Sequence, residues 1–224
     1  MAAMILKAEA LTKDFPTPSG PLRILDGVSF SIDPGESVSI TGPSGSGKSS
    51  LLGLLAGLDR PTSGRVLFKE TSVSEMEETE LCAWRRTSVG FVFQNFELVS
   101  SLTALENAAL PLEILGRSAK EAAARAGEIL AALGMGARSG HFPHELSGGE
   151  QQRTAIARAY IHEPEIIFAD EPTGSLDEET ARSVVDSLLG INRRIKTALV
   201  LVTHNPELAR QLDRSLTIHG GKLA

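Results

Sequence analysis

The stretch Gly42-Pro43-Ser44-Gly45-Ser46-Gly47-Lys48-Ser49 decides the fold. It matches the pattern G-x-x-x-x-G-K-[ST] and lies between a β-branched run at residues 37–40 and an apolar helical run at residues 49–55. Its glycines let consecutive backbone N–H groups turn inward, and the N-terminus of the following helix adds partial positive charge. We therefore expect this loop to cradle the phosphates of a nucleotide, with Lys48 on the terminal phosphates and the Ser49 hydroxyl on Mg²⁺.

Composition and charge narrow the class of protein. The 224 residues include 22 Lys and Arg against 28 Asp and Glu, a formal net charge of −6, and only 4% are aromatic. Proteins that coat nucleic acid need a basic surface and aromatic stacking platforms, so we expect no nucleic-acid partner. Cys82 is the only cysteine, which excludes an intramolecular disulfide and a cysteine-based zinc site.

The sequence also lacks the usual signals for membrane insertion and export. The longest notable apolar run, at residues 51–58, is far shorter than the roughly 20 residues of a membrane-spanning helix. Residues 1–10 contain Lys7 and Glu9 and no long apolar run, unlike a signal peptide. We expect one soluble, intracellular domain over residues 1–224, long enough to bury a sizeable core.

Short β-branched runs alternate with helical stretches, which is typical of an α/β fold with a largely parallel sheet. The runs that we predict to be buried strands are residues 37–40, 89–93, 166–169 and 198–203. Two further runs, residues 28–32 and 66–69, alternate in polarity and are predicted to form an antiparallel edge sheet.

Capping patterns locate several helices. Ser118 with Glu121 forms a capping box, Asp177 precedes two glutamates, and Asn205 precedes a proline at the first helical position. The stretch from about residue 95 to residue 161 is nearly all helical and lies between two predicted strands. We predict that it is a helical subdomain inserted in the α/β core.

A phosphate loop needs an acid to hold magnesium, and the run at residues 166–171 supplies two. Asp170 comes at the end of a predicted buried strand, where it can bind Mg²⁺. Because side chains alternate along a strand, Glu171 can face away from the metal and act as general base on a water molecule. Alternatively, both acids belong to a solvated turn before Pro172. Beside a phosphate loop, two carboxylates with separate tasks favour hydrolysis over binding alone.

His204 follows the predicted strand at residues 198–203, at the sheet edge where open α/β folds bind ligands. There it can contact the γ-phosphate and hold the attacking water. The competing interpretation is an ordinary loop or capping histidine. No role is assigned to the other histidines, which are His141, His144, His162 and His219.

Leu146-Ser147-Gly148-Gly149-Glu150-Gln151 resembles the signature motif of ATP-binding-cassette (ABC) ATPases. In the same chain Gln94 resembles the Q-loop of that family, residues 175–177 its D-loop, and His204 its switch histidine. The matches occur in the family's order and span nearly the whole chain. The resemblance implies a P-loop NTPase with a RecA-like core, an antiparallel β subdomain and an inserted helical subdomain.

The resemblance also implies ATP as the nucleotide, Mg²⁺ as the ion, and a role for each matched residue. Lys48, Glu171 and His204 would be catalytic, and Mg²⁺ would be held by Ser49, Gln94 and Asp170. The residues that would contact ATP are Phe15 (against the adenine), Gly42, Pro43, Ser44, Gly45, Ser46, Gly47, Lys48, Ser49, Ser50, Gln94, Ser147, Gly148, Gly149 and Asp177.

Ser147, Gly148 and Gly149 open a helix, so they form a second anion-seeking surface beside residues 42–49. One ATP can use both surfaces only if a second copy supplies the other, which predicts a head-to-tail homodimer with ATP at its interface. ATP-driven closure of that dimer would give a mechanical stroke. The structural alternative is that the two glycines only let helices approach closely.

Within the family, the chain is similar to the lipoprotein-releasing and macrolide-exporter (MacB/LolD) branch, with YbbA-like and FtsE-like ATPases as near relatives. The segments that carry it are residues 57–59, 90–94, 102–107, 110–112 and 169–174. Ser50 and Ser175 depart from the usual threonine and asparagine, without putting hydrolysis in doubt. The branch implies integral membrane permease subunits as partners, on the cytoplasmic face of the membrane.

The apolar segment around residues 94–102 is predicted to dock the permease. The alternative is that its apolar side chains are ordinary subdomain core. Two other functions remain open on the sequence alone. A regulatory ABC ATPase would switch a membrane partner without transport, and a soluble one would act in DNA repair or translation. Acidic charge, the lack of a coiled-coil insertion and the single cassette disfavour the latter.

Overall fold

A computed structural model describes residues 4–18 and 20–224 of the chain. Contacts within the chain divide it into two units, one of Met1–Arg85 with Ala198–Ala224 and the other of Arg86–Thr197. In the part of the chain that the structure describes, no helix is both long enough and apolar enough to cross a membrane.

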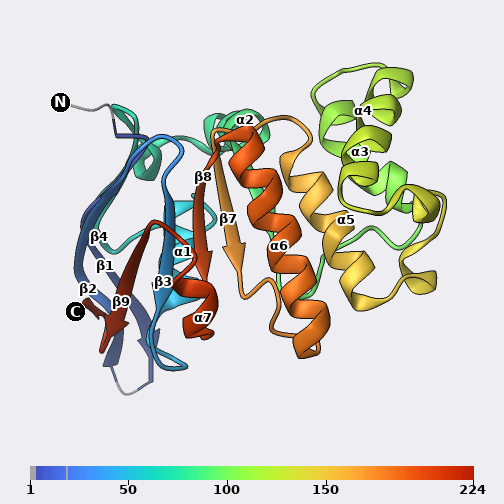
Figure 1. Cartoon of the computed structure of the whole chain (residues 1–224). Helices are drawn as coiled ribbons and strands as arrows, with labels where there is room; N and C mark the ends of the chain where they lie inside the picture. Colours follow the sequence, from blue (N-terminus) through green and yellow to red (C-terminus); the bar gives the residue numbers. More distant parts are fainter. Residues whose placement is uncertain (1–3, 19) are drawn as a thin grey trace. The chain divides into compact units, whose positions relative to one another are not determined.

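The first unit contains an antiparallel sheet with the strand order β2-β1-β4-β5 (Figure 1). Its strands are β1 (Leu6–Thr17), β2 (Gly20–Ile32), β4 (Ser63–Phe68) and β5 (Thr71–Ser72). The two predicted edge segments lie in β2 and β4, but β1 lies between them and pairs with both. β1 was not predicted, because bulges interrupt its alternation and Ala10 has a left-handed φ of 48°.

The same unit holds three parallel strands that carry the phosphate loop. β3 (Ser37–Thr41) pairs in parallel with β8 (Ala198–Val202) on one side and with β9 (Arg214–His219) on the other. The short β10 (Lys222–Leu223) runs antiparallel to β9. The apolar side chains of β3 and β8 are buried, as the sequence predicted.

Four short elements complete this unit. They are α1 (Lys48–Leu55), directly after the phosphate loop, a 3₁₀ turn η1 (Val73–Glu75), α2 (Glu78–Ser88), which crosses the boundary between the units, and α7 (Pro206–Ala209). Asn205 caps α7, because its Oδ1 accepts hydrogen bonds from the backbone N–H groups of Glu207 and Leu208. The predicted cap at Asn205 is therefore confirmed.

The second unit pairs two parallel strands, β6 (Val89–Val92) and β7 (Ile166–Asp170), both of which were predicted. Its helices are α3 (Ala104–Ile114), α4 (Ala119–Ala132), α5 (Gly148–Tyr160) and α6 (Glu178–Ile195). The predicted caps at Ser118 and Asp177 open α4 and α6. Helices α5 and α6 lie side by side (Figure 1). The buried Tyr160 hydroxyl donates to Asn192 Oδ1 at 2.9 Å, which joins the two helices.

Residues 95–161, all of which the structure describes, contain α3, α4, α5 and the 3₁₀ turns η2 (Gly136–Arg138) and η3 (Pro143–Glu145), and no strand. This agrees with the helical character predicted for the segment. That the segment forms a separate inserted subdomain remains a prediction.

Candidate functional site

The phosphate loop adopts backbone angles that only glycine takes readily. Gly42, Gly45 and Gly47 have φ values of 146°, 76° and 97°. A Cβ atom at Gly42 would lie 2.2 Å from the backbone oxygen of Ile218, and one at Gly47 would lie 2.9 Å from that of Ile24. The loop is thus held against β9 on one side and β2 on the other, and its shape depends on both glycines.

The N-terminus of α1 is open to an anion. Gly47 stands at the N-cap position, the described chain gives the helix no side-chain cap, and its first turn contains no acidic residue. By contrast, side chains cap α3, α4, α5, α6 and α7. Because the first backbone N–H groups of a helix need an acceptor, the open end of α1 suits a phosphate group.

Lys48 is the first residue of this helix. Its side chain is buried, and its Nζ atom donates to the backbone oxygens of Gly42 and Pro43, each at 3.0 Å. The Ser46 hydroxyl is also buried and has no hydrogen-bond partner among the described residues. An ammonium group and an unsatisfied hydroxyl in one glycine loop are the groups that a phosphate chain would contact.

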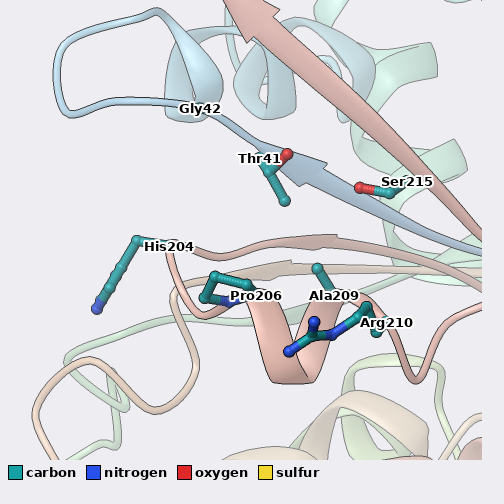
Figure 2. A pocket seen from close by; sticks show the side chains of 7 residues that line it. All are labelled: Thr41, Gly42, His204, Pro206, Ala209, Arg210 and Ser215. Carbon is teal, nitrogen blue, oxygen red and sulfur yellow. The ribbon is translucent and has the colours of Figure 1, made fainter.

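His204 lies beside the start of the same loop. The Thr203 backbone N–H donates to the Ile40 oxygen at 3.2 Å, so the end of β8 is fixed next to β3. A cavity of about 390 Å³ is lined by Thr41, Gly42, His204, Pro206, Ala209, Arg210 and Ser215. Figure 2 shows the His204 ring pointing away from the other labelled side chains. The structure therefore brings the predicted histidine to the phosphate-loop end of β3.

Phe15 lies on the hairpin that touches the phosphate loop. In the β1–β2 pairing, Phe15 is opposite Leu22, two residues along β1 from the Lys13–Leu25 pair. A Cβ at Gly47 would lie 3.0 Å from a side-chain carbon of Leu25, so the hairpin and the loop are in contact there. The Phe15 side chain is 39% exposed. The exposed Phe15 ring lies on a hairpin that contacts the phosphate loop, which fits the predicted adenine contact.

The two predicted acids lie in the second unit at the end of β7. The strand ends at Asp170, and Glu171 has a left-handed φ of 44°. We expected the alternation of side chains along a strand to turn Glu171 away from Asp170. That reason is wrong, because the strand ends before Glu171. A left-handed residue that is not glycine is uncommon, and such strain is concentrated at functional sites.

Gln94 lies beside the loop that follows these acids. Its backbone oxygen accepts a hydrogen bond from the Ser175 hydroxyl at 3.2 Å. A Cβ at Gly174 would lie 2.8 Å from Gln94 Nε2, so the glutamine amide packs directly on that glycine. The Gly174 N–H in turn donates to the Glu171 oxygen at 3.0 Å. The second unit thus gathers the predicted glutamine and glutamate in one cluster.

Arg158 is a residue that the sequence did not point to. Phe96 and Glu97 follow Gln94 and have left-handed φ values of 64° and 49°. The Arg158 guanidinium, on α5, donates to the backbone oxygens of both residues. Burial lowers the pKa of Arg158 from its ordinary value. Nothing in the local sequence shows that these carbonyl groups need an arginine some 60 positions away, so only the fold reveals it.

The segment at residues 146–151 opens α5. The Ser147 hydroxyl accepts from the Glu150 N–H at 3.3 Å, and Glu150 accepts from the Ser147 N–H at 2.8 Å. These backbone contacts lower the pKa of Glu150. The Arg138 side chain pairs with Glu150 at 3.2 Å. A capping box therefore fixes Ser147 at the exposed start of the helix.

Both glycines of this segment also serve close packing. A Cβ at Gly148 would lie 2.9 Å from a methyl carbon of Leu176, and one at Gly149 would lie 2.4 Å from the Thr180 methyl. Asp177 caps α6 by accepting from the Thr180 N–H at 3.0 Å and from its hydroxyl at 2.7 Å. These bonds hold the pKa of Asp177 below its ordinary value. The two glycines therefore do let the helices approach closely, as the structural alternative predicted. This packing role is compatible with a phosphate contact.

The donor set proposed for Mg²⁺ consists of oxygen groups. Among the described residues, no cluster of three or more His, Cys, Asp or Glu side chains could hold a metal. A hydroxyl from Ser49, an amide from Gln94 and a carboxylate from Asp170 suit Mg²⁺, which commonly takes one or two carboxylates and completes its shell with phosphates and water. The chemistry of these residues fits the ion.

Replacing Gly42 by alanine should lower the free energy of unfolding by about 2–4 kcal/mol, because the new Cβ meets the Ile218 oxygen and φ is unfavourable. The matched control is Gly45→Ala, where φ is also positive but a Cβ meets no atom within 4 Å. That variant should lose only about 1 kcal/mol. Chemical denaturation of both variants measures the difference, and equal losses would contradict the packing argument.

Comparisons with known proteins agree with this arrangement. A family model described as "ABC transporter" matches residues 25–174. The lipoprotein-releasing system ATP-binding protein LolD of Legionella pneumophila (strain Paris) is 44% identical over 223 residues, covering 100% of this chain and 98% of that protein. LolD of Chromohalobacter salexigens is 44% identical over 221 residues, covering 99% and 93%.

Among solved structures, a dimeric post-hydrolysis state of the ATP-binding cassette MJ0796, bound to ADP and Pi, superposes with a TM-score of 0.89. It is 39% identical to this chain, and the match covers 97% of this chain and 96% of that one.

Proposed function

Because the chain belongs to the ABC transporter family, we propose that it powers a lipoprotein-releasing type of ABC system, as a homodimer bound to separate membrane permease subunits. The chain is an ATP-binding and ATP-hydrolysing transporter subunit with the α/β fold of P-loop ATPases. The single observation that carries the proposal is the phosphate loop, where the ammonium of buried Lys48 contacts the loop backbone at the uncapped start of α1.

Each predicted residue has its own proposed task. Lys48 and the N–H groups of α1 would contact the phosphates, Phe15 the adenine and His204 the γ-phosphate. Glu171 would hold a water molecule and take its proton as general base during attack on the γ-phosphorus, as the bond to ADP breaks and ADP leaves. Mg²⁺, when bound, would neutralise charge on the phosphates, held by Ser49, Gln94 and Asp170.

The start of α5 is proposed to act on the ATP of a second copy. Ser147 is exposed at an N-terminus whose first backbone N–H groups favour anions. The dimeric cassette MJ0796, to which this chain is similar over nearly its full length, supports a two-chain assembly. ATP would then link two bodies, and its hydrolysis would release them.

The permease is proposed to dock on residues 94–102, at the cytoplasmic face of the membrane. Val99 is apolar and yet 40% exposed. The Arg158 guanidinium fixes the backbone of this segment by donating to two of its carbonyl oxygens. The segment is continuous with Gln94, whose amide packs on Gly174 near the Glu171 backbone. A docking surface placed there would sense the state of the nucleotide site.

The test is capture from membranes with a tagged Glu171→Gln chain, supplied with ATP and Mg²⁺. We expect a permease with few transmembrane helices and a large extracytoplasmic domain to co-purify. Leu98→Asp in the same background should abolish the capture while ATP binding persists. Recovery of only soluble partners or nucleic acid would overturn the transporter assignment in favour of a soluble ABC ATPase. A membrane partner without substrate movement would instead indicate a regulatory role.

A further inference from the structure

We propose that Lys13 is a positioning residue of the nucleotide site, which covers one face of the Phe15 ring with a fixed cation and so holds the ring ready to stack on adenine. This inference rests on the proposed role of Phe15. It adds a determinant of base recognition to a site otherwise described by its phosphate contacts.

The position of the Lys13 ammonium is fixed by three contacts. Its Nζ atom lies 2.7 Å from each carboxylate oxygen of Asp59 and donates to the Arg60 backbone oxygen at 2.8 Å. The lysine side chain is only 12% exposed. A lysine held in this way loses little further freedom when a neighbouring group binds a ligand.

The same ammonium lies 5.0 Å from the centroid of the Phe15 ring. A cation within about 6 Å of an aromatic face is attracted to the negative charge density of that face. The ring nevertheless remains 39% exposed. One face is thus anchored by charge, while exposed ring surface is left for a planar base, which would stack in an offset arrangement.

Asp59 connects this anchor to the phosphate loop. It follows α1, the helix that starts at Lys48, and its backbone N–H donates to the Gly53 oxygen of that helix. The lysine therefore ties the β1–β2 hairpin to the far end of the phosphate-binding helix. With the contact between Gly47 and Leu25, the hairpin is attached to both ends of the phosphate-binding element. The separation between the base and phosphate contacts is set by these two attachments.

The sequence offers a matched control on the same antiparallel sheet. The Lys69 Nζ atom lies 5.5 Å from the centroid of the Phe68 ring, a cation–aromatic pair of the same kind. Phe68 is only 6% exposed and packs edge-on against Trp84, so it has no free face for a base. Lys69→Met removes an equivalent charge and an equivalent pair at a place where the proposal expects no effect on nucleotide binding.

The experiment measures dissociation constants for ATP and for inorganic tripolyphosphate, which lacks the base, on the full chain with Mg²⁺. Lys13→Met should weaken ATP binding about 3- to 10-fold, the usual range for a cation–aromatic contact, and leave tripolyphosphate binding unchanged. Lys13→Arg keeps a cation over the ring and should restore most of the ATP affinity. Lys69→Met should match the unmodified chain for both ligands.

A double-mutant cycle separates positioning from general damage. In a Phe15→Leu background, which has no ring to hold, Lys13→Met should change ATP affinity no further. Equal weakening of ATP and tripolyphosphate, or an undiminished effect without the ring, would overturn the inference. If the unmodified chain binds no ATP, the proposed function itself fails, and that result does not depend on Lys13. Thermal unfolding of each variant identifies any that fold poorly, and Lys13→Gln then replaces such a variant.

Discussion

Replacing Glu171 by glutamine should slow ATP hydrolysis by about 10²–10⁴-fold and leave ATP binding intact. The amide keeps the size of the side chain but cannot take a proton from the attacking water. Glu171 is a left-handed residue at the end of β7, and its backbone oxygen accepts from the Gly174 N–H. Because the change affects only the side-chain terminus, that backbone arrangement should persist.

The measurement is single-turnover hydrolysis under conditions where every chain carries ATP, with affinity measured separately. Glu70→Gln removes an exposed carboxylate in the first unit and serves as the control for charge alone. Near-normal hydrolysis by the Glu171 variant would remove this residue from the role of base. A parallel loss of ATP affinity would instead indicate that the carboxylate is needed to build the site.

Mixing two inactive chains should restore activity if the start of α5 works on the partner's ATP. Lys48→Ala removes the ammonium proposed to bind phosphate, and Ser147→Arg blocks the exposed start of α5, so each homodimer should lose hydrolysis by at least about 10²-fold. A mixed dimer retains one intact site, with Lys48 from one chain and Ser147 from the other. At equal amounts, activity should rise to at most about a quarter of normal, since about half of the dimers are mixed and each has one working site.

Hydrolysis that stays at the level of the separate variants, when mixed dimers are shown to form by co-purification of two different tags, would count against the shared site. Gly140→Arg is a suitable control for the bulky charged substitution. It lies in the connection before α5, and a Cβ there meets no atom within 4 Å.

The sequence predicted best those features that depend on neighbours along the chain. The phosphate loop is set by the spacing of its own glycines, and the caps at Ser118, Asp177 and Asn205 each act within three residues. Buried strands such as β7 were visible as short apolar runs. In these cases the residues that determine the local structure lie close together in the sequence.

Features that depend on distant parts of the chain were missed or explained wrongly. β1 escaped prediction because bulges disturb its alternation, and strand alternation could not foresee the left-handed Glu171 directly after the end of β7. The pairing of Lys13 with Asp59 spans 46 positions, and the hold of Arg158 on Phe96 spans 62. No local pattern distinguishes these cations from ordinary surface charges.

The contacts of Gly148 and Gly149 have a consequence for the timing of the reaction cycle. A Cβ at Gly149 would lie 2.4 Å from the Thr180 methyl, so the start of α5 packs closely against the start of α6. Only six residues separate Glu171 from α6, so a short segment connects the proposed general base to the surface that the chain would present to its partner's nucleotide. In a head-to-tail dimer, two such connections would link each nucleotide site to the other. Release of phosphate at one site would then affect the other site, and hydrolysis of the two ATP molecules would be coupled.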